Sequence, residues 1–268
     1  LWERMHEILL TEDIIHADET PLRVLKRNGQ QVDGQSRMWV FCSGKYSEHK
    51  MALYYHHATR SGKVVEKILG DYSKYLQTDG CASYNAAVKA IHIGCWAHAR
   101  RKWTDCLPKG IDDKNSKAAQ ALELIERIFA ADKGLEGIPE NDRRTKVLKP
   151  LLDKYWKLLE TIDAPKGSGI YKAMLYSVNQ KEQLNNVLLD SRIKLTNNLA
   201  ERAIKPFVVG RKNWLFSDTD KGADASARCY SIIESAKANN LNVFGYLTHL
   251  LTALPKLGTE PITEQLDE

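Results

Sequence analysis

Apolar and aromatic residues gather in three short runs near the start of the chain. The runs are EDIIHADE, RMWVFCS and MALYYHH, and the segments that separate them, KRNGQQVDGQ and SGKYSEHK, are rich in polar and turn-forming residues. β-branched and aromatic residues favour strands, whereas Gly and Asn favour turns. The pattern therefore predicts three strands between residues 12 and 57, joined by short turns into an antiparallel meander.

The hydrophobic period changes after residue 60. SGKVVEKILGDY has the spacing of an amphipathic helix, YLQTD that of a short strand, ASYNAAVKA that of another helix and IHIGC that of another strand. From about residue 96 to about residue 200 the pattern is helical throughout. One apolar stripe consists of Leu122, Ile125 and Phe129, and a longer one of Leu148, Leu151, Leu152, Tyr155, Leu158, Leu159 and Ile162. ADASARCYSIIESAKAN and NVFGYLTHLLTAL predict two more helices near the end.

A three-strand antiparallel meander, then alternating strands and helices, then a later helix is the element order of a ribonuclease H-like fold, a mixed α/β sheet. In that fold an acid on the central first strand lies beside an acid at the end of the fourth strand, and a later helix brings a third. Asp18 ends the run IIHAD and Asp79 ends YLQTD, so we expect both at strand ends, while LTNNLAERAIKPF supplies Glu201. His16 and Glu19 flank Asp18 and are expected to point away from it.

Glu201 has a second interpretation. Asn198, three residues earlier, completes a capping-box pattern in which both side chains satisfy free N–H groups at a helix start. A glutamate in the first turn can serve the helix and also bind a metal.

Three neighbouring carboxylates need a counter-charge. At about 4 Å they would repel by roughly 4 kcal/mol per pair at an effective dielectric constant of 20. Mg²⁺, a hard cation that prefers a few carboxylates together with water and phosphate oxygens, suits such a site. Two ions in one site promote in-line phosphoryl displacement. We therefore expect Mg²⁺ or Mn²⁺, as two ions bound by Asp18, Asp79 and Glu201.

Composition narrows the class of protein. The 268 residues are 43% hydrophobic and 27% charged, which excludes a disordered chain. A net charge of +5 weakly favours a polyanionic partner. Five cysteines without a CxxC pair favour a reducing compartment, so we expect a cytoplasmic protein. No apolar run approaches the roughly 20 residues of a membrane-spanning helix.

Four blocks together resemble the catalytic domain of the transposases of insertion sequence family 66, which belong to the DDE class. The blocks are HADETPLRVL, LQTDGCASYNA, GCWAHARRKW and NNLAERAIKPFVVGRKNWLFSDT, in the order of the family. The similarity covers nearly the whole chain and weakens between about 108 and 190. Two small departures, FSDTD and Trp103, leave the acids unchanged.

The resemblance implies that Asp18, Asp79 and Glu201 are the catalytic, metal-binding triad. It implies a ribonuclease H-like core formed by residues 1–107 and completed by residues 191–268, with residues 108–190 as an α-helical insertion before the glutamate helix. It also implies a preceding DNA-end-binding part, with which a chain beginning at leucine is consistent.

Two further groups have open interpretations. Cys95 and His98 in CWAH have half of a zinc-site spacing without a second pair. The segment resembles the C-x-x-H signature of several cut-and-paste transposases, which would place His98 near the scissile phosphate, and a histidine packed on a helix is the alternative. Basic clusters near the acids suit DNA contact, and the candidates are Arg100, Arg101, Lys102, Lys205, Arg211, Lys212, Asn213 and Trp214.

The expected function is that of a DNA transposase, with metal-dependent hydrolysis at the element's ends followed by attack of the 3′-OH on target DNA. The expected partners are element and target DNA, a second copy in a synaptic complex and accessory proteins of the same element, in a bacterial, nucleoid-associated setting. A structure-specific nuclease of the same fold and an inactive DNA-binding regulator are the alternatives. A glycosidase would need two carboxylates and no metal.

Overall fold

The computed structural model describes residues 1–107, 115–135, 141–258 and 265–266. The chain divides into two compact units. Unit 1 comprises Leu1–Leu76, Ala82–Ala90 and Asn198–Glu268, and unit 2 comprises Gln77–Cys81 and Ile91–Asn197. The chain thus passes between the units after Leu76, Cys81, Ala90 and Asn197. The domain limits expected near residues 107 and 190 stay predictions, and residues 108–114 lie outside the described ranges.

Unit 1 contains a mixed sheet built around a long strand, β1 (Ile14–Arg27). β1 pairs antiparallel with β3 (Gln35–Ser43), and β3 pairs antiparallel with β4 (Ala52–His57). The predicted meander is confirmed. β7 (Ser217–Thr219) pairs in parallel with the far end of β1, and β5 (Tyr75–Gln77) is the neighbour of β1 on the side opposite β3.

A tight turn at Asn28 and Gly29 returns β1 into the short β2 (Gln30–Gln31). Both residues have a positive φ, of 50° and 79°, as a two-residue hairpin turn requires.

The length of β1 corrects the expected place of Asp18. The strand continues past it to Arg27, and Asp18 pairs with Val40 in the interior of the sheet instead of ending the strand. Thr20, Leu22 and Val24 continue the alternating pattern beyond Asp18, and each of the three is buried. Since residues two apart on a strand share a face, His16 lies on the same face as Asp18, and the expectation that it points away was wrong. Glu19 lies on the opposite face, as expected.

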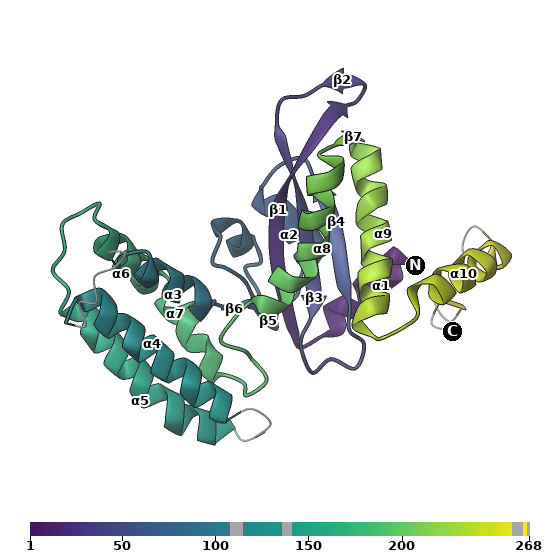
Figure 1. Ribbon diagram of the computed structural model, residues 1–268. Helices are drawn as coiled ribbons and strands as arrows, with labels where there is room; N and C mark the ends of the chain where they lie inside the picture. The colour runs from purple at the N-terminus through teal and green to yellow at the C-terminus, as the bar shows by residue number, and fades with distance from the viewer. Residues whose placement is uncertain (108–114, 136–140, 259–264, 267–268) are drawn as a thin grey trace. The chain divides into compact units, whose positions relative to one another are not determined.

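Two helices cover the face of the sheet that carries Asp18. They are α8 (Asn198–Trp214) and α9 (Asp220–Ala238), and Figure 1 shows them lying along the strands. A cluster of buried apolar residues fills much of the space between these helices and the sheet. Its buried members are Leu22, Val24, Met38, Val40, Cys42, Ala52, Tyr54, Ala200, Ile204, Phe207, Ala223 and Ala227.

The opposite face packs against α2 (Gly62–Leu69) and the short 3₁₀ turn η1 (Ala82–Ala86). Tyr84 of η1 meets Trp39 edge to face and donates its hydroxyl to Glu19 at 2.7 Å. The full helix predicted for ASYNAAVKA is wrong, since only this turn forms. Ser83 donates its hydroxyl to the backbone carbonyl of Arg60, 23 residues earlier, at 2.7 Å, so a contact with a distant segment holds this turn.

The outer edge of the sheet, along β4, is covered by side chains. Ser235 and Ser231 of α9 accept hydrogen bonds from the N–H groups of Ala52 and Tyr54, and Trp2 of α1 (Trp2–Thr11) donates to the Tyr54 carbonyl. Covered edges resist pairing with another chain. After α9 the chain forms α10 (Val243–Ala253) and the 3₁₀ turn η3 (Leu254–Leu257).

Unit 2 is mainly helical, as predicted. After β6 (Ile91–Ile93) come α3 (Trp96–Thr104), α4 (Lys117–Gly134), α5 (Asn141–Glu160), α6 (Gly169–Asn179), α7 (Lys181–Asn185) and η2 (Asn186–Leu188). The long stripe around Tyr155 is confirmed by the burial of Leu148 and Leu152. The stripe predicted for α4 was rotated, because Ala118, Ala121, Ile125 and Ile128 are the buried residues and Leu122 and Phe129 are only half-buried.

Buried tryptophans in the core of unit 2 have hydrogen-bond partners. Trp103 donates its indole N–H to the Tyr155 hydroxyl at 2.9 Å, and that hydroxyl lies 2.7 Å from the Ser177 hydroxyl. Trp96 donates to the Leu184 carbonyl and Trp156 to the Asn185 side chain. Among the helices in the described ranges, none has the length and apolar content needed to cross a membrane.

Candidate functional site

Asp18 lies part-exposed on a strand whose neighbouring residues are buried. Its Oδ1 accepts the N–H of Glu19 at 2.8 Å. The buried Cys42 lies close enough to sense the Asp18 charge: burial, and secondly the Asp18 carboxylate, raise the pKa of the Cys42 thiol to about 12. The carboxylate therefore lies at the margin of a dry core, with access to solvent on one side.

Glu201 lies in the first turn of α8, which packs on the same face of the sheet. The helix begins at Asn198, so the capping position falls on Asn197 and the expected capping box of Asn198 with Glu201 is wrong. Asn197 is fully buried and donates its backbone N–H to the Cys95 sulfur at 3.3 Å. The side chain of Glu201 is part-exposed, as is that of Asp18, and both residues belong to unit 1.

The helical period separates the basic residues of α8 into two groups. Lys205 and Lys212 lie within about 40° of Glu201 around the helix axis, and both are exposed. Arg211 instead continues the buried stripe of Ile204 and Phe207. Its guanidinium donates to the Thr20 hydroxyl at 3.0 Å and to the Pro21 carbonyl. Arg211 thus holds α8 to β1, whereas the two lysines face outward beside Glu201.

Other members of the predicted basic set also have structural contacts. Trp214 packs edge to face on Phe207 with ring centroids 5.2 Å apart, and Arg100 pairs with Glu126. Lys102 lies 6.0 Å from the centre of the Tyr176 ring. Arg101 and Asn213 are exposed.

Asp79 lies in unit 2, two residues after the end of β5, in a turn fixed by polar contacts. Its Oδ1 accepts the N–H of Cys81 at 2.8 Å, and its backbone carbonyl accepts the Tyr176 hydroxyl at 3.1 Å. Burial, and secondarily the charges of Cys95 and Asp79, raise the pKa of Tyr176, which keeps this hydroxyl a donor. Gly80 has a φ of 84°, which favours glycine.

The residue before this turn, Gln77, is fully buried and donates to the carbonyl of Lys194 at 2.6 Å. Thr78 donates its N–H to the Ile93 carbonyl. No local sequence pattern indicates a role for Tyr176, because its partner is 97 residues away.

Cys95 and His98 lie at the start of α3 in unit 2. Cys95 is fully buried and its carbonyl accepts the His98 N–H at 3.1 Å, while the His98 ring is part-exposed. The ring is thus accessible from solvent next to a buried thiol.

The three acids suit a hard divalent cation by the chemistry of their donors. Each is a part-exposed carboxylate on a well-anchored element, and Mg²⁺ prefers carboxylate oxygens with room for water and phosphate. Asp18 and Glu201 lie in unit 1 and Asp79 lies in unit 2.

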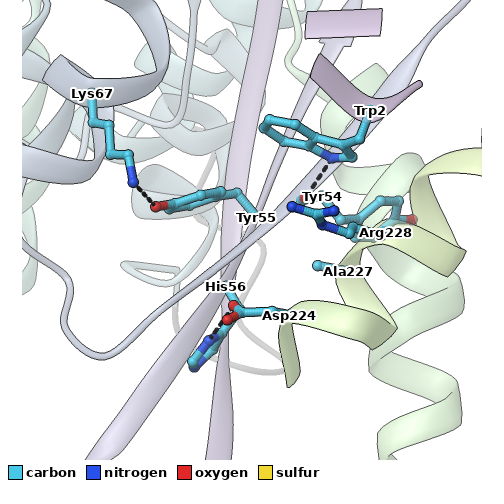
Figure 2. Close-up of a pocket in the computed structure, with 8 residues that line it drawn as sticks. All are labelled: Trp2, Tyr54, Tyr55, His56, Lys67, Asp224, Ala227 and Arg228. Atoms are coloured by element: carbon cyan, nitrogen blue, oxygen red, sulfur yellow. Dashed lines mark hydrogen bonds and ion pairs between the residues drawn. The ribbon is translucent and has the colours of Figure 1, made fainter. Parts of the chain in front are cut away.

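Unit 1 also contains cavities that the sequence did not indicate. One of about 230 Å³ lies at the edge of β4, and Figure 2 shows its lining. Its charged groups are paired: Lys67 donates to the Tyr55 hydroxyl at 2.9 Å, Arg228 pairs with Glu3, and His56 bonds to Asp224 at 3.0 Å. Internal pairing leaves this cavity little charge to offer a ligand.

Comparison with known proteins places the chain in a family. Residues 1–225 match the model described as transposase IS66 family, and residues 231–265 match the IS66 C-terminal element. No solved structure matches the chain.

Curated relatives come from Sinorhizobium fredii (strain NBRC 101917 / NGR234). The uncharacterized protein y4hP is 27% identical over 274 residues, covering 93% of this chain and 49% of that protein. The uncharacterized protein y4qI is 26% identical over 257 residues, covering 90% and 47%. The chain spans about half the length of these relatives. Because the first family match extends over residues 1–225, the chain belongs to the transposase IS66 family.

Proposed function

We propose that this chain is the catalytic part of a DDE-type DNA transposase with a ribonuclease H-like core. In this proposal Asp18, Asp79 and Glu201 bind two Mg²⁺ or Mn²⁺ ions. The reaction is hydrolysis of a phosphodiester at the element's end, followed by attack of the freed 3′-OH on target DNA. Family membership supports the transposase class.

The observation that carries the assignment of the acids is their placement. Asp18 lies on the sheet and Glu201 on the helix that packs against it, and both side chains are part-exposed beside a cluster of buried apolar residues. Asp79 is the third residue after the chain crossing at Leu76, and Glu201 is the fourth after the crossing at Asn197. Acids on elements this well anchored suit a ligand set that must keep its geometry during the reaction.

The carboxylates act as ligands and not as proton donors. Divalent cations held by such acids supply Lewis acidity to the attacking and leaving oxygens of the displacement. The chain's own contribution is to fix the ligands: β1 holds Asp18, the apolar face of α8 holds Glu201, and the turn bonded by Tyr176 holds Asp79. His98 is the candidate contact to the scissile phosphate.

DNA is the proposed polyanionic partner, and α8 supplies part of the surface that contacts it. Lys205 and Lys212 lie on the same side of α8 as Glu201 and are exposed, which suits contact with phosphates next to the cleaved bond. Arg101 on α3 is a third exposed candidate. A synaptic complex with a second copy, and accessory proteins of the element, complete the proposal.

The test uses the full-length protein with labelled element ends and a target plasmid. Asp18→Asn, Asp79→Asn and Glu201→Gln should each abolish Mg²⁺-dependent cleavage and joining. Asp71→Asn is the matched control, since Asp71 has a side chain that is 89% exposed and pairs with Lys89. As a readout independent of activity, Mg²⁺ should raise the melting temperature of the unaltered protein and of the control, because ligands that bind the folded state stabilise it.

The outcomes separate the alternatives. Joined product supports a transposase, cleavage without joining supports a nuclease, and DNA binding without either supports an inactive regulator. Wild-type cleavage by Glu201→Gln would remove Glu201 from the ligand set.

A further inference from the structure

A second cavity of unit 1 combines an apolar floor with a cationic rim. It has a volume of about 410 Å³, within the range of small-molecule sites. The floor consists of Cys42, Met51, Ala52, Leu199, Ala203 and Ala238. The rim has four cations, Lys45, Lys50, Arg202 and Lys237, and one carboxylate, Glu234, so three net positive charges remain (four minus one).

The rim is held in place by its backbone. Asn239, at the end of α9, accepts the N–H of Lys50 at 3.2 Å and donates to the Lys50 carbonyl at 2.7 Å. The Ser43 hydroxyl accepts the N–H of Met51 at 2.9 Å. The wall between β3 and β4 is thus fixed before any ligand arrives, which reduces the cost of binding.

The cations differ in how they are paired. Lys237 pairs with Glu234 at 2.7 Å. Arg202, on the first turn of α8, and Lys50 are exposed and have no side-chain hydrogen bond or ion pair within the described residues. An unpaired guanidinium at the mouth of a cavity is suited to bidentate recognition of phosphate.

Two residues that line the cavity are linked to the candidate acids of unit 1, Asp18 and Glu201. Arg202 directly follows Glu201, and Cys42 on the floor is the thiol that senses the Asp18 charge. An apolar floor suits the face of a base, and a cationic rim suits the phosphate attached to it. A base paired inside a duplex could not enter such a cavity.

We propose that this cavity binds one unstacked nucleotide of the DNA strand, with its base on the floor and its phosphate on Arg202 and Lys50. The proposal rests on the proposed function in one respect, that DNA is the substrate. It assigns the cavity the role of holding a displaced base close to the cleaved bond.

The test measures binding without divalent metal, by fluorescence anisotropy of a labelled short thymidine strand. An otherwise identical strand with abasic sites should bind roughly tenfold more weakly, the size expected for loss of one base contact. Lys50→Ala with Arg202→Ala should make the slope of log affinity against log salt shallower by about 1.4, since each phosphate contact on a single strand contributes about 0.7. Lys63→Ala with Lys221→Ala removes the same charge from exposed residues outside the cavity and is the matched control.

Filling the floor provides the second variant. Ala238→Leu should abolish the preference for the normal strand over the abasic strand while keeping the salt slope. Equal binding of both strands by the unaltered protein, or an unchanged slope in the double variant, would overturn the proposal. If thymidine monophosphate competed with the strand and bound as tightly as the strand does, the cavity would be a site for free nucleotides and not for DNA. Because no cleavage is measured, inactive acids would overturn the proposed function without changing these results.

Discussion

The two units support their candidate acids by different physical means. In unit 1 the elements that carry Asp18 and Glu201 are held by apolar packing, with α8 buried against the sheet through Ala200, Ile204 and Phe207. In unit 2 the turn that carries Asp79 is held by individual polar bonds, among them that from Tyr176. Apolar packing tolerates small shifts of many contacts, whereas a polar turn depends on each donor and acceptor.

The largest effect should follow from truncating the apolar support. Phe207 is fully buried and its ring meets those of Tyr54, Trp214 and Tyr230. Phe207→Ala should lower the free energy of unfolding by about 3–5 kcal/mol. Denaturation in urea measures the loss. Hydrogen exchange should locate the loss in unit 1, and equal weakening of unit 2 would show that the units do not unfold separately.

Val209→Ala is the control on the same helix. Val209 is 51% exposed, so its truncation should change the free energy of unfolding by less than about 0.5 kcal/mol. A comparable loss for the two variants would mean that α8 is not held by its buried face.

A smaller effect is expected from the polar turn of unit 2. Gly80 has a φ of 84°, and a Cβ there would lie 2.8 Å from the Gln180 Oε1. Gly80→Ala should cost about 1–2 kcal/mol through the left-handed backbone alone. It should also weaken cleavage, because Asp79 is the preceding residue. The free energy of unfolding and the cleavage rate are both measured.

Gly29→Ala provides the comparison for Gly80. Gly29 has a φ of 79° and no atom near the added Cβ, so it reports backbone strain only. Any excess cost at Gly80 measures the contact with Gln180, and the excess should vanish in the Gly80→Ala, Gln180→Ala double variant. A larger cost at Gly29 than at Gly80 would contradict the role assigned to the turn.

The contrast between periodic apolar packing and individual polar bonds also explains which features could be predicted from the sequence. The meander, the long stripe of α5 and helix α9 follow from periodic burial, which is local in the sequence, whereas α10 was predicted from its apolar pattern and has no buried residue. Whether the three acids act together stays a prediction.

The errors have particular physical causes. β1 continues past Asp18 because Leu22 and Val24 extend its buried face beyond the run that the pattern singled out. Arg211 was grouped with Lys212 by sequence, although one turns inward and the other outward. Contacts such as Tyr176 with Asp79 join distant segments, and no local pattern reports them.

The smallest effect concerns the Cys42 thiol, whose pKa responds to Asp18, and tests how far burial keeps water from the apolar core of unit 1. The pKa of Cys42 is raised from 9.0 to about 12, first by burial and second by Asp18. The folded state therefore keeps a proton that the unfolded chain loses above pH 9. Stability from this group is complete below pH 9 and declines as the pH rises toward 12, by up to about 1.4 kcal/mol per pH unit. Urea denaturation between about pH 8 and about pH 10, below the ordinary range of tyrosine, should show this decline.

Cys42→Ala should remove this contribution to the slope of the free energy of unfolding against pH, whatever the stability of the variant at neutral pH. Asp18→Asn should keep most of this slope, because burial is the larger cause of the raised pKa. An equal loss of slope in both variants would instead make the Asp18 charge the main cause. It would also show that water reaches the core more readily than its packing indicates.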